Sequence, residues 1–230
     1  MRDNLWRSPA RGAVPADHSP RRHLADCHSA DDRRVGIVSR TVTQHRIYLG
    51  GPHPTLAAAD AHRHWHERHS RIAPGLPRLR GYVQNRPLQE WWGVFPYTTC
   101  AESWYGSREA EVESYSSAYY RDVVVVDEAR FIDRDASWTS PVTRTELVRP
   151  GPRTSRRVLA FGALPEDAAA CAAPGRLELL HLHRAPPGES SPVILSFWTD
   201  DAESARAAVA GVTGTACVVR PVAIVEPAWE

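Results

Sequence analysis

The segment RIYLGGPHPTLAAADAHRHWHERHSRIAPGLPRLRGYVQNR, residues 46–86, decides the fold because it predicts a strand, a helix and a second strand in close succession. Residues 35–49 are rich in Val, Ile, Thr and Tyr, which favours a strand, and Gly50-Gly51-Pro52 is expected to end it. A helix is expected from a cap at Thr55 to Ile72, before a Pro-Gly pair. Residues 78–86 then predict the second strand.

The same alternation continues downstream and recurs after the Pro-rich linker 150–155, so the order β-α-β-β-α-β is expected twice. Each such unit gives a four-stranded antiparallel sheet with helices on one face, and its open face needs a cover. The sequence therefore predicts an α+β fold of two tandem ferredoxin-like modules that form a fused α/β barrel. The remaining expected elements are strand 94–105, a helix from the Ser107 cap to Asp122, irregular residues 123–133, strand 138–148, strand 157–161, helix 165–173, strands 176–183 and 192–198, a helix from the Asp200 cap to Ala210, and strand 215–225.

Composition places the chain among ordinary globular proteins. It has 230 residues, a formal net charge of +1 and 42% hydrophobic residues, which gives no argument for binding nucleic acid or a membrane surface. No apolar stretch has the length of a membrane span or the core of a secretory signal, so a cytoplasmic location is expected. Cys27, Cys100, Cys171 and Cys217 are far apart, which favours free, mostly buried thiols.

The first helix carries four histidines and is the main candidate for chemistry. At about 100° per residue, Ala61 and Trp65 lie on its apolar stripe, His62 and His69 lie on the flank of that stripe, and His64 is nearer to solvent. A half-buried imidazole beside an indole suits general acid/base catalysis at neutral pH. The competing interpretation is a histidine at the edge of the core with one satisfied hydrogen bond.

A metal site on this helix is not expected. His62, His66 and His69 have helical spacing, but Ser70 stands where the zinc-protease pattern requires its second histidine. No acidic residue shares their face of the helix. The sequence predicts neither a metal nor an organic cofactor.

Several motifs in residues 35–149 resemble the EthD family of the dimeric α/β-barrel superfamily. The similar segments are Trp65–His69, Leu76–Asn85 with its YVQN strand, Ala101–Tyr105, Ser114–Tyr120, Asp127–Asp133 and the position of Glu146. Two departures are Ala61, where the family usually has Phe, and residues 91–97, which replace its usual turn and are expected to reshape the mouth of the cavity. The second module, 156–230, lacks these motifs and is expected to be a degenerate half that covers the sheet. Residues 1–34 are expected to be a partly disordered extension.

The resemblance implies a fold and a site. Members are similar to polyketide cyclases, aromatases and dehydratases that use no metal or organic cofactor. By resemblance, the cavity lies between the sheet and the helices of residues 35–149, and the helix histidine that faces it is His69. Tyr82 and Asn85 are then candidates to line the site.

An aromatic-lined cavity with a histidine would suit aldol cyclisation or dehydration of an aromatic or polyketide-type intermediate in bacterial secondary metabolism. These reactions need a base for an α-proton and a donor for the enolate oxygen. His69 is assigned as acid or base, and Asn85 or Tyr82 as the oxyanion donor. Asp127 would orient His69, or alternatively would cap a helix or turn. The expected substrate-binding residues are His62, Trp65, Trp92, Trp104, Tyr97 and Asp127.

Two other functions stay open on the sequence alone. One is a cofactor-free or haem-dependent monooxygenase, because barrel relatives include both types. The other is a non-catalytic binding protein for a hydrophobic intermediate. The expected partner is a small hydrophobic or aromatic molecule, with no nucleic acid and no membrane, and a homodimer is also left open.

Overall fold

The computed structural model describes residues 44–227 apart from residues 93, 172–174 and 213. The expected N-terminal extension, Cys27 and the first part of the expected strand 35–49 lie outside the described residues. The described residues belong to one compact unit.

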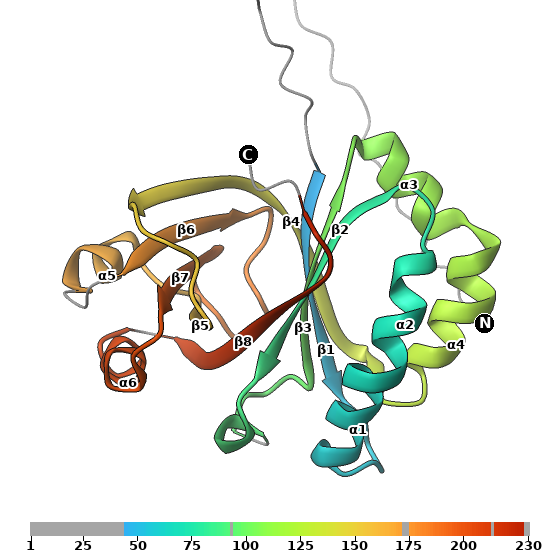
Figure 1. The fold of residues 1–230 in the computed structure, drawn as a ribbon, viewed down its shortest axis with the longest axis horizontal. Coiled ribbons are helices and arrows are strands. Elements are labelled where there is room, and N and C mark those ends of the chain that lie inside the picture. The colour runs from blue at the N-terminus through green and yellow to red at the C-terminus, as the bar shows by residue number, and fades with distance from the viewer. Residues whose placement is uncertain (1–43, 93, 172–174, 213, 228–230) are drawn as a thin grey trace, which may run out of the picture. The chain divides into compact units, whose positions relative to one another are not determined.

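The strands of the described residues close into a single barrel (Figure 1). Its cyclic order is β1-β3-β2-β8-β5-β7-β6-β4, and every neighbouring pair is antiparallel. The first four strands are in the order β4-β1-β3-β2 and the last four in the order β8-β5-β7-β6, so the two halves repeat one arrangement. The fold is therefore mixed α+β with a closed barrel, as predicted. The strands are β1 Gln44–Pro52, β2 Leu79–Pro87, β3 Thr99–Tyr105, β4 Ile132–Arg149, β5 Arg156–Phe161, β6 Arg176–Leu182, β7 Val193–Thr199 and β8 Thr215–Val225.

Helices cover the outside of the barrel in two groups. Figure 1 shows α1 to α4 beside the strands of the first half, and α5 and α6 beside those of the second half. The two groups differ in length and in the kinds of helix they contain. Among the described residues, two π-helical turns occur, and both belong to the first group. The helices are α1 Ala58–His64, η1 Trp65–His69, α2 Ser70–Ile72, η2 Ala73–Gly75, η3 Gln89–Trp91, α3 Arg108–Ser116, η4 Tyr120–Val124, α4 Val125–Glu128, α5 Pro165–Ala170 and α6 Ala202–Ala210.

Several element boundaries differ from the sequence-based expectation. The first helix begins after Ala57, which makes no side-chain cap, so the prediction of Thr55 as the cap is wrong. Residues 123–128 are helical, not irregular, because α4 continues directly from η4. The cap of α6 is Asp201, one residue after the predicted Asp200. Ser107 does cap α3, where its side chain accepts a hydrogen bond from the Ala110 amide.

The two glycines expected to end the first strand lie inside it. β1 runs through Gly50 and Gly51 to Pro52, and its register against β4 shifts between Leu49 and Gly51. A Cβ atom on Gly51 would lie 2.6 Å from the Cβ of Ala136, so only glycine allows β4 to pass this closely. Here glycine marks a bulge in a continuing strand and not its end.

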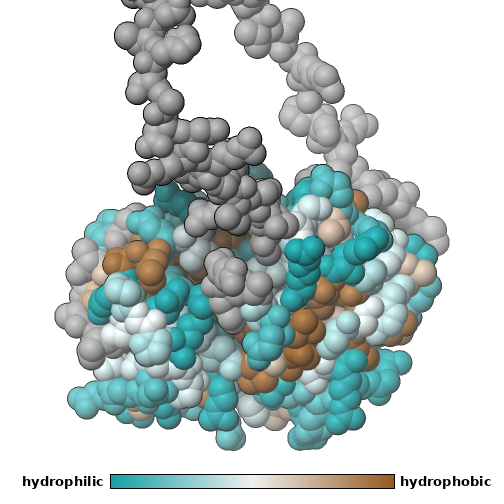
Figure 2. Space-filling view, turned by 45° about the horizontal axis from the view of Figure 1, so that its top comes forward, coloured by the Kyte–Doolittle hydropathy of each residue, from teal (hydrophilic) through white to brown (hydrophobic). Residues whose placement is uncertain are grey.

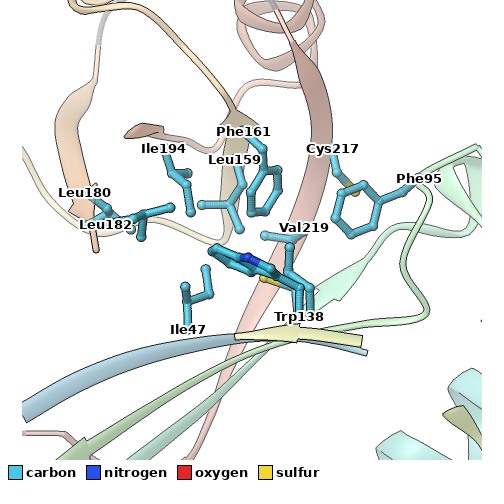
Figure 3. Packing of buried hydrophobic residues seen from close by; sticks show 12 residues of the cluster. Ile47, Phe95, Trp138, Leu159, Phe161, Leu180, Leu182, Ile194, Cys217 and Val219 are labelled. Atoms are coloured by element: carbon cyan, nitrogen blue, oxygen red, sulfur yellow. The ribbon is translucent and has the colours of Figure 1, made fainter. Parts of the chain in front are cut away.

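The barrel interior holds the main apolar core. Figure 3 shows side chains from β4, β5, β6, β7 and β8 converging on the barrel axis, with Ile47 from β1 and Phe95 from the loop before β3. Trp138, Leu159, Phe161 and Cys217 are each at most 5% exposed. Because both halves contribute to this core, neither half buries its apolar sheet face without the other.

A buried polar network adjoins this core and joins the two halves. Arg157 of β5 forms an ion pair with Glu102 of β3, and both side chains are nearly inaccessible to solvent. Glu102 also accepts a hydrogen bond of 2.8 Å from Asn85 and contacts His45 Nε2 at 2.9 Å. Arg157 Nε donates to Ser196 at 2.7 Å. Each buried charge in this network has an opposite charge or a hydrogen-bond partner. Without these partners, burial of the charges would be costly.

The face of the molecule drawn in Figure 2 is mostly polar. Figure 2 shows apolar surface in separate patches among polar side chains on the face drawn there. None of the helices in the described part of the chain has both the length and the apolar character needed to cross a membrane.

Cys100 and Cys217 are free and buried, as predicted, and Cys171 is free and partly buried. The exposed large apolar side chains are Val94, Val112, Val123, Val126, Leu147 and Val148.

Candidate active site

His69 lies at the end of the π-helical turn η1 and is bound to a carboxylate on α4. Its Nδ1 atom is 3.0 Å from Asp127 Oδ2, and the imidazole is buried. The other oxygen of Asp127 is 2.9 Å from His64 Nε2. One aspartate therefore contacts two imidazoles, and of the two roles considered for Asp127 the structure shows the contact with His69.

The π-helical turn explains why the first helix differs from its α-helical projection. Trp65 and His69 are both buried, and His64 is partly buried against Asp127 where solvent was expected. The ring of His64 stacks on Phe131 at 4.9 Å, and the ring of His69 is 5.1 Å from the same phenylalanine. A π turn holds more residues than an α turn, so an α-helical wheel misplaces side chains around it. π turns are frequent at functional sites.

The electrostatics favour a charged Asp127. Burial alone would raise the pKa of Asp127, but hydrogen bonds from His69 and His64 hold it below its ordinary value. Arg68 Nε lies 3.3 Å from Oδ1 of the same carboxylate. Because an ionised carboxylate only accepts hydrogen bonds, His69 donates from Nδ1, which leaves Nε2 as the nitrogen that holds the lone pair when the ring is neutral. This is the tautomer that a histidine base requires.

The residue after Asp127 adds a second carboxyl group that the sequence analysis did not select. Glu128 is 8% exposed, and burial raises its pKa although Arg134 lies 3.3 Å from its Oε2 atom. The pKa of Tyr48 on β1 is also raised. The main cause is burial of the phenol, and the second is the charge of Glu128. The only sequence signal for Glu128 is its place beside Asp127 in the segment 127–133.

Tyr82 and Trp65 pack together beneath the first helix. Both are buried in the cluster between the helices and β2, and Gln84 Nε2 donates a 3.1 Å hydrogen bond to the Trp65 carbonyl. Burial raises the pKa of Tyr82 to about 12, so its phenol stays protonated at neutral pH. Tyr82 thus remains a possible hydrogen-bond donor on the same side of the sheet as His69.

Three of the predicted site residues lie on the other side of the sheet. Asn85 points into the barrel, where it contacts Glu102 and Arg157, and Trp104 stacks on His45 in the interior at 4.4 Å. Tyr97 packs against the apolar core of the barrel. Side chains three apart on a strand point to opposite faces, so Tyr82 and Asn85 cannot share one pocket. The placement of Asn85, Trp104 and Tyr97 with His69 was therefore wrong.

His62 and Trp92 form a separate contact. The two rings stack with centroids 4.6 Å apart, and Trp92 Nε1 donates to the Pro87 carbonyl at 3.1 Å. The imidazoles that contact Asp127 are those of His64 and His69, so the His62–Trp92 stack lies outside that contact.

The helices around His69 are closely packed. A shallow, open depression of about 300 Å³ lies near one end of these helices. The depression is lined in part by Ala129, Ile132 and Arg134, which flank Phe131 in sequence. Within the described residues, no group of three or more His, Cys, Asp or Glu side chains is arranged to hold a metal ion.

Comparison with protein families gives one match, to the EthD domain, at residues 53–135. This range contains the π-helical turn, β2, β3 and Asp127, and it lies within the range of the predicted resemblance. The match to the EthD domain thus falls within the first half of the barrel. No curated protein matches this chain.

Solved structures resemble the chain only distantly. One is described as a crystal structure study of an anthrone oxidase-like protein, with 14% identity, a TM-score of 0.45, and coverage of 82% of this chain and 96% of the other. Another is a putative monooxygenase from Fusobacterium nucleatum subsp. nucleatum, with 8% identity, a TM-score of 0.44, and coverage of 79% and 93%. A third is a putative monooxygenase from Lactobacillus acidophilus, with 10% identity, a TM-score of 0.40, and coverage of 79% and 94%.

Proposed function

We propose that the protein is a cyclase or dehydratase that acts by histidine acid/base catalysis on an aromatic or polyketide-type carbonyl compound. The observation that carries this proposal is the buried hydrogen bond of 3.0 Å between His69 Nδ1 and Asp127 Oδ2. The bond fixes the tautomer, orients the ring, and stabilises the imidazolium that forms when Nε2 takes a proton.

In the proposed reaction, His69 Nε2 removes a proton from a carbon between two carbonyl groups. The electron pair of the broken C–H bond moves to the carbonyl oxygen, and Tyr82 donates a hydrogen bond to the enolate. The enolate carbon then attacks a second carbonyl of the same molecule and forms a C–C bond. His69 returns its proton to the oxygen of that carbonyl, which leaves the enzyme unchanged and gives an aldol product.

We further infer that the barrel consists of two ferredoxin-like modules fused in one chain. The repeated strand order β4-β1-β3-β2 and β8-β5-β7-β6 supports this inference, as does the antiparallel pairing of β2 with β8 and of β4 with β6. In this arrangement the second half serves as the built-in partner, and the catalytic site belongs to the half with His69.

Substrate entry requires movement of the packed helix layer, because His69 is only 5% exposed. The depression at Ala129, Ile132 and Arg134 supports entry from that end of the layer. Arg134 also forms the ion pair with Glu128, so opening at this end would separate the two charges.

The proton-abstraction step can be tested without knowledge of the natural substrate. The probe is an aromatic 1,3-diketone in D₂O, and the measurement is the rate of deuterium incorporation at the carbon between its carbonyls, by mass spectrometry. The wild type is expected to accelerate exchange, and His69→Gln is expected to lose a factor of roughly 100 or more. His181→Gln, which changes a histidine in the other half of the barrel, is the matched control.

Two other outcomes would replace the proposal. Consumption of O₂ with the diketone or an anthrone, with or without an absorbing haem on the purified protein, would support an oxygenase. Binding of the diketone with equal affinity by the wild type and His69→Gln, without any exchange, would support a binding protein.

A further inference from the structure

Two arginines face each other at the seam between the halves of the barrel. Arg86 on β2 is the direct cross-strand partner of Arg220 on β8, so both side chains lie on the same face of the sheet. Like charges in directly opposite positions destabilise a sheet. Arg86 is partly buried and Arg220 is exposed.

Neither arginine has a carboxylate partner among the described residues. The two hydrogen bonds of Arg86 to a side chain go to Gln84 Oε1, at 3.0 and 2.8 Å, and a third contact of 3.4 Å goes to the His66 carbonyl. All of these acceptors are neutral. The described ion pairs of this chain include many other arginines, such as Arg46, Arg78 and Arg157, but not this pair.

Unsatisfied imidazole nitrogens belong to the helix segment whose His66 carbonyl contacts Arg86. His66 Nε2 and His62 Nδ1 are both buried and have no hydrogen-bond partner, and His62 as a whole is 2% exposed. Burial lowers the pKa of each histidine to about 4, and the charge of Arg86 further lowers that of His66. Both rings are therefore neutral at pH 7, and each has an N–H group that can donate.

The Arg86 charge makes this cluster a poor cation site, although His62 and His66 have the helical spacing of metal ligands. An oxyanion has the opposite requirement, because it needs positive charge and hydrogen-bond donors together. Trp92, stacked on His62, adds a flat apolar wall. We propose that Arg86, Arg220, His62 and His66 form a binding site for the oxyanion of a small molecule, a carboxylate or a phosphate.

This site is separate from the proposed catalytic residues. The imidazoles that contact Asp127 belong to His64 and His69, whereas His62 and His66 contact each other, with ring centroids 5.8 Å apart. Binding of an oxyanion at Arg86 and Arg220 therefore does not depend on the reaction proposed for His69, and the two ideas can fail independently.

The test is calorimetric titration of the full chain with sodium benzoate and with inorganic phosphate, at constant ionic strength set by sodium chloride. The wild type is expected to bind at least one of the two, and the tighter ligand identifies the site as a carboxylate or a phosphate site. Arg220→Gln is expected to weaken that binding at least tenfold. Arg206→Gln, which removes one charge from an exposed position on α6, is the matched control and should bind as the wild type does.

Further variants separate the site from general charge effects and from misfolding. His66→Phe keeps an aromatic ring but removes Nε2, and it is expected to weaken binding severalfold without loss of the folded signal in circular dichroism. His69→Gln is expected to bind the anion like the wild type. The proposal is overturned if neither anion binds beyond the chloride background, or if Arg220→Gln and Arg206→Gln bind equally well.

Discussion

Replacement of Glu102 by Gln tests the contact that joins the two halves of the barrel. Glu102 and Arg157 are 1% and 2% exposed, so the substitution leaves a guanidinium buried without its counter-charge. Loss of one partner from a buried pair costs about 3–5 kcal/mol. Since domains have unfolding free energies of about 5–15 kcal/mol, we expect Glu102→Gln to lose a large fraction of the stability.

The assay is urea unfolding monitored by tryptophan fluorescence, with the m-value as a check on two-state behaviour. Glu146→Gln removes a carboxylate that is 47% exposed and should cost no more than about 1 kcal/mol. The double variant Glu102→Gln/Arg157→Met should be more stable than the sum of the single effects predicts, because it removes both buried charges. A cost below about 1 kcal/mol for Glu102→Gln would refute the reasoning.

The pH dependence gives an independent check on the same pair. Burial alone would raise the pKa of Glu102, but Arg157 and the hydrogen bonds from His45 and Asn85 hold it far below its ordinary value. A lowered pKa in the folded state contributes stability that is complete above the unfolded value of about 4.3 and is lost as the pH falls towards the folded value. The advantage of the wild type over Glu102→Gln should therefore shrink by roughly 1.4 kcal/mol per pH unit below about 4.3.

Three further predictions concern the proposed catalytic site and two local contacts. Asp127→Asn should slow diketone exchange at least roughly tenfold, because its amide can stabilise the wrong tautomer of His69; an unchanged rate would remove Asp127 from the mechanism. Gly51→Val should destabilise the protein by about 1–3 kcal/mol in urea unfolding, because its side chain would collide with Ala136; a stable variant would show that β4 can move aside. Ser107→Ala should cost about 1 kcal/mol through loss of the α3 cap, and no measurable change in urea would mean that solvent replaces this bond.

The sequence predicted the alternation of strands and helices because apolar periodicity and turn residues are local signals. Strand 215–225 agrees with β8 at both ends, and the strand predicted at 176–183 exceeds β6 by one residue. The strand at 94–105 begins five residues late, at Thr99. Phe95 and Tyr97 in this segment pack in the barrel core from a loop, and buried aromatic residues in a loop look the same in sequence as those in a strand.

The site was predictable only where contacts follow from one element. The burial of His69 on the first helix was predicted, and its contact with Asp127 was weighed against a capping role of that carboxylate. The misplacement of Asn85 was avoidable, since strand alternation separates it from Tyr82. The Glu102–Arg157 pair joins residues 55 positions apart, and no local pattern marks either one as buried.

The π-helical turn at residues 65–69 makes the position of His69 depend on the local helix geometry. If the same residues were wound into ordinary α geometry, the part of the helix after the turn would rotate relative to the part before it by about 100°. Trp65 would still reach the apolar layer in such a chain, but His69 would no longer meet the carboxylate that holds it. The histidine–aspartate contact therefore rests on the extra residue that the π turn holds, and a homologue one residue shorter here would keep the directions of both helix ends with α geometry alone.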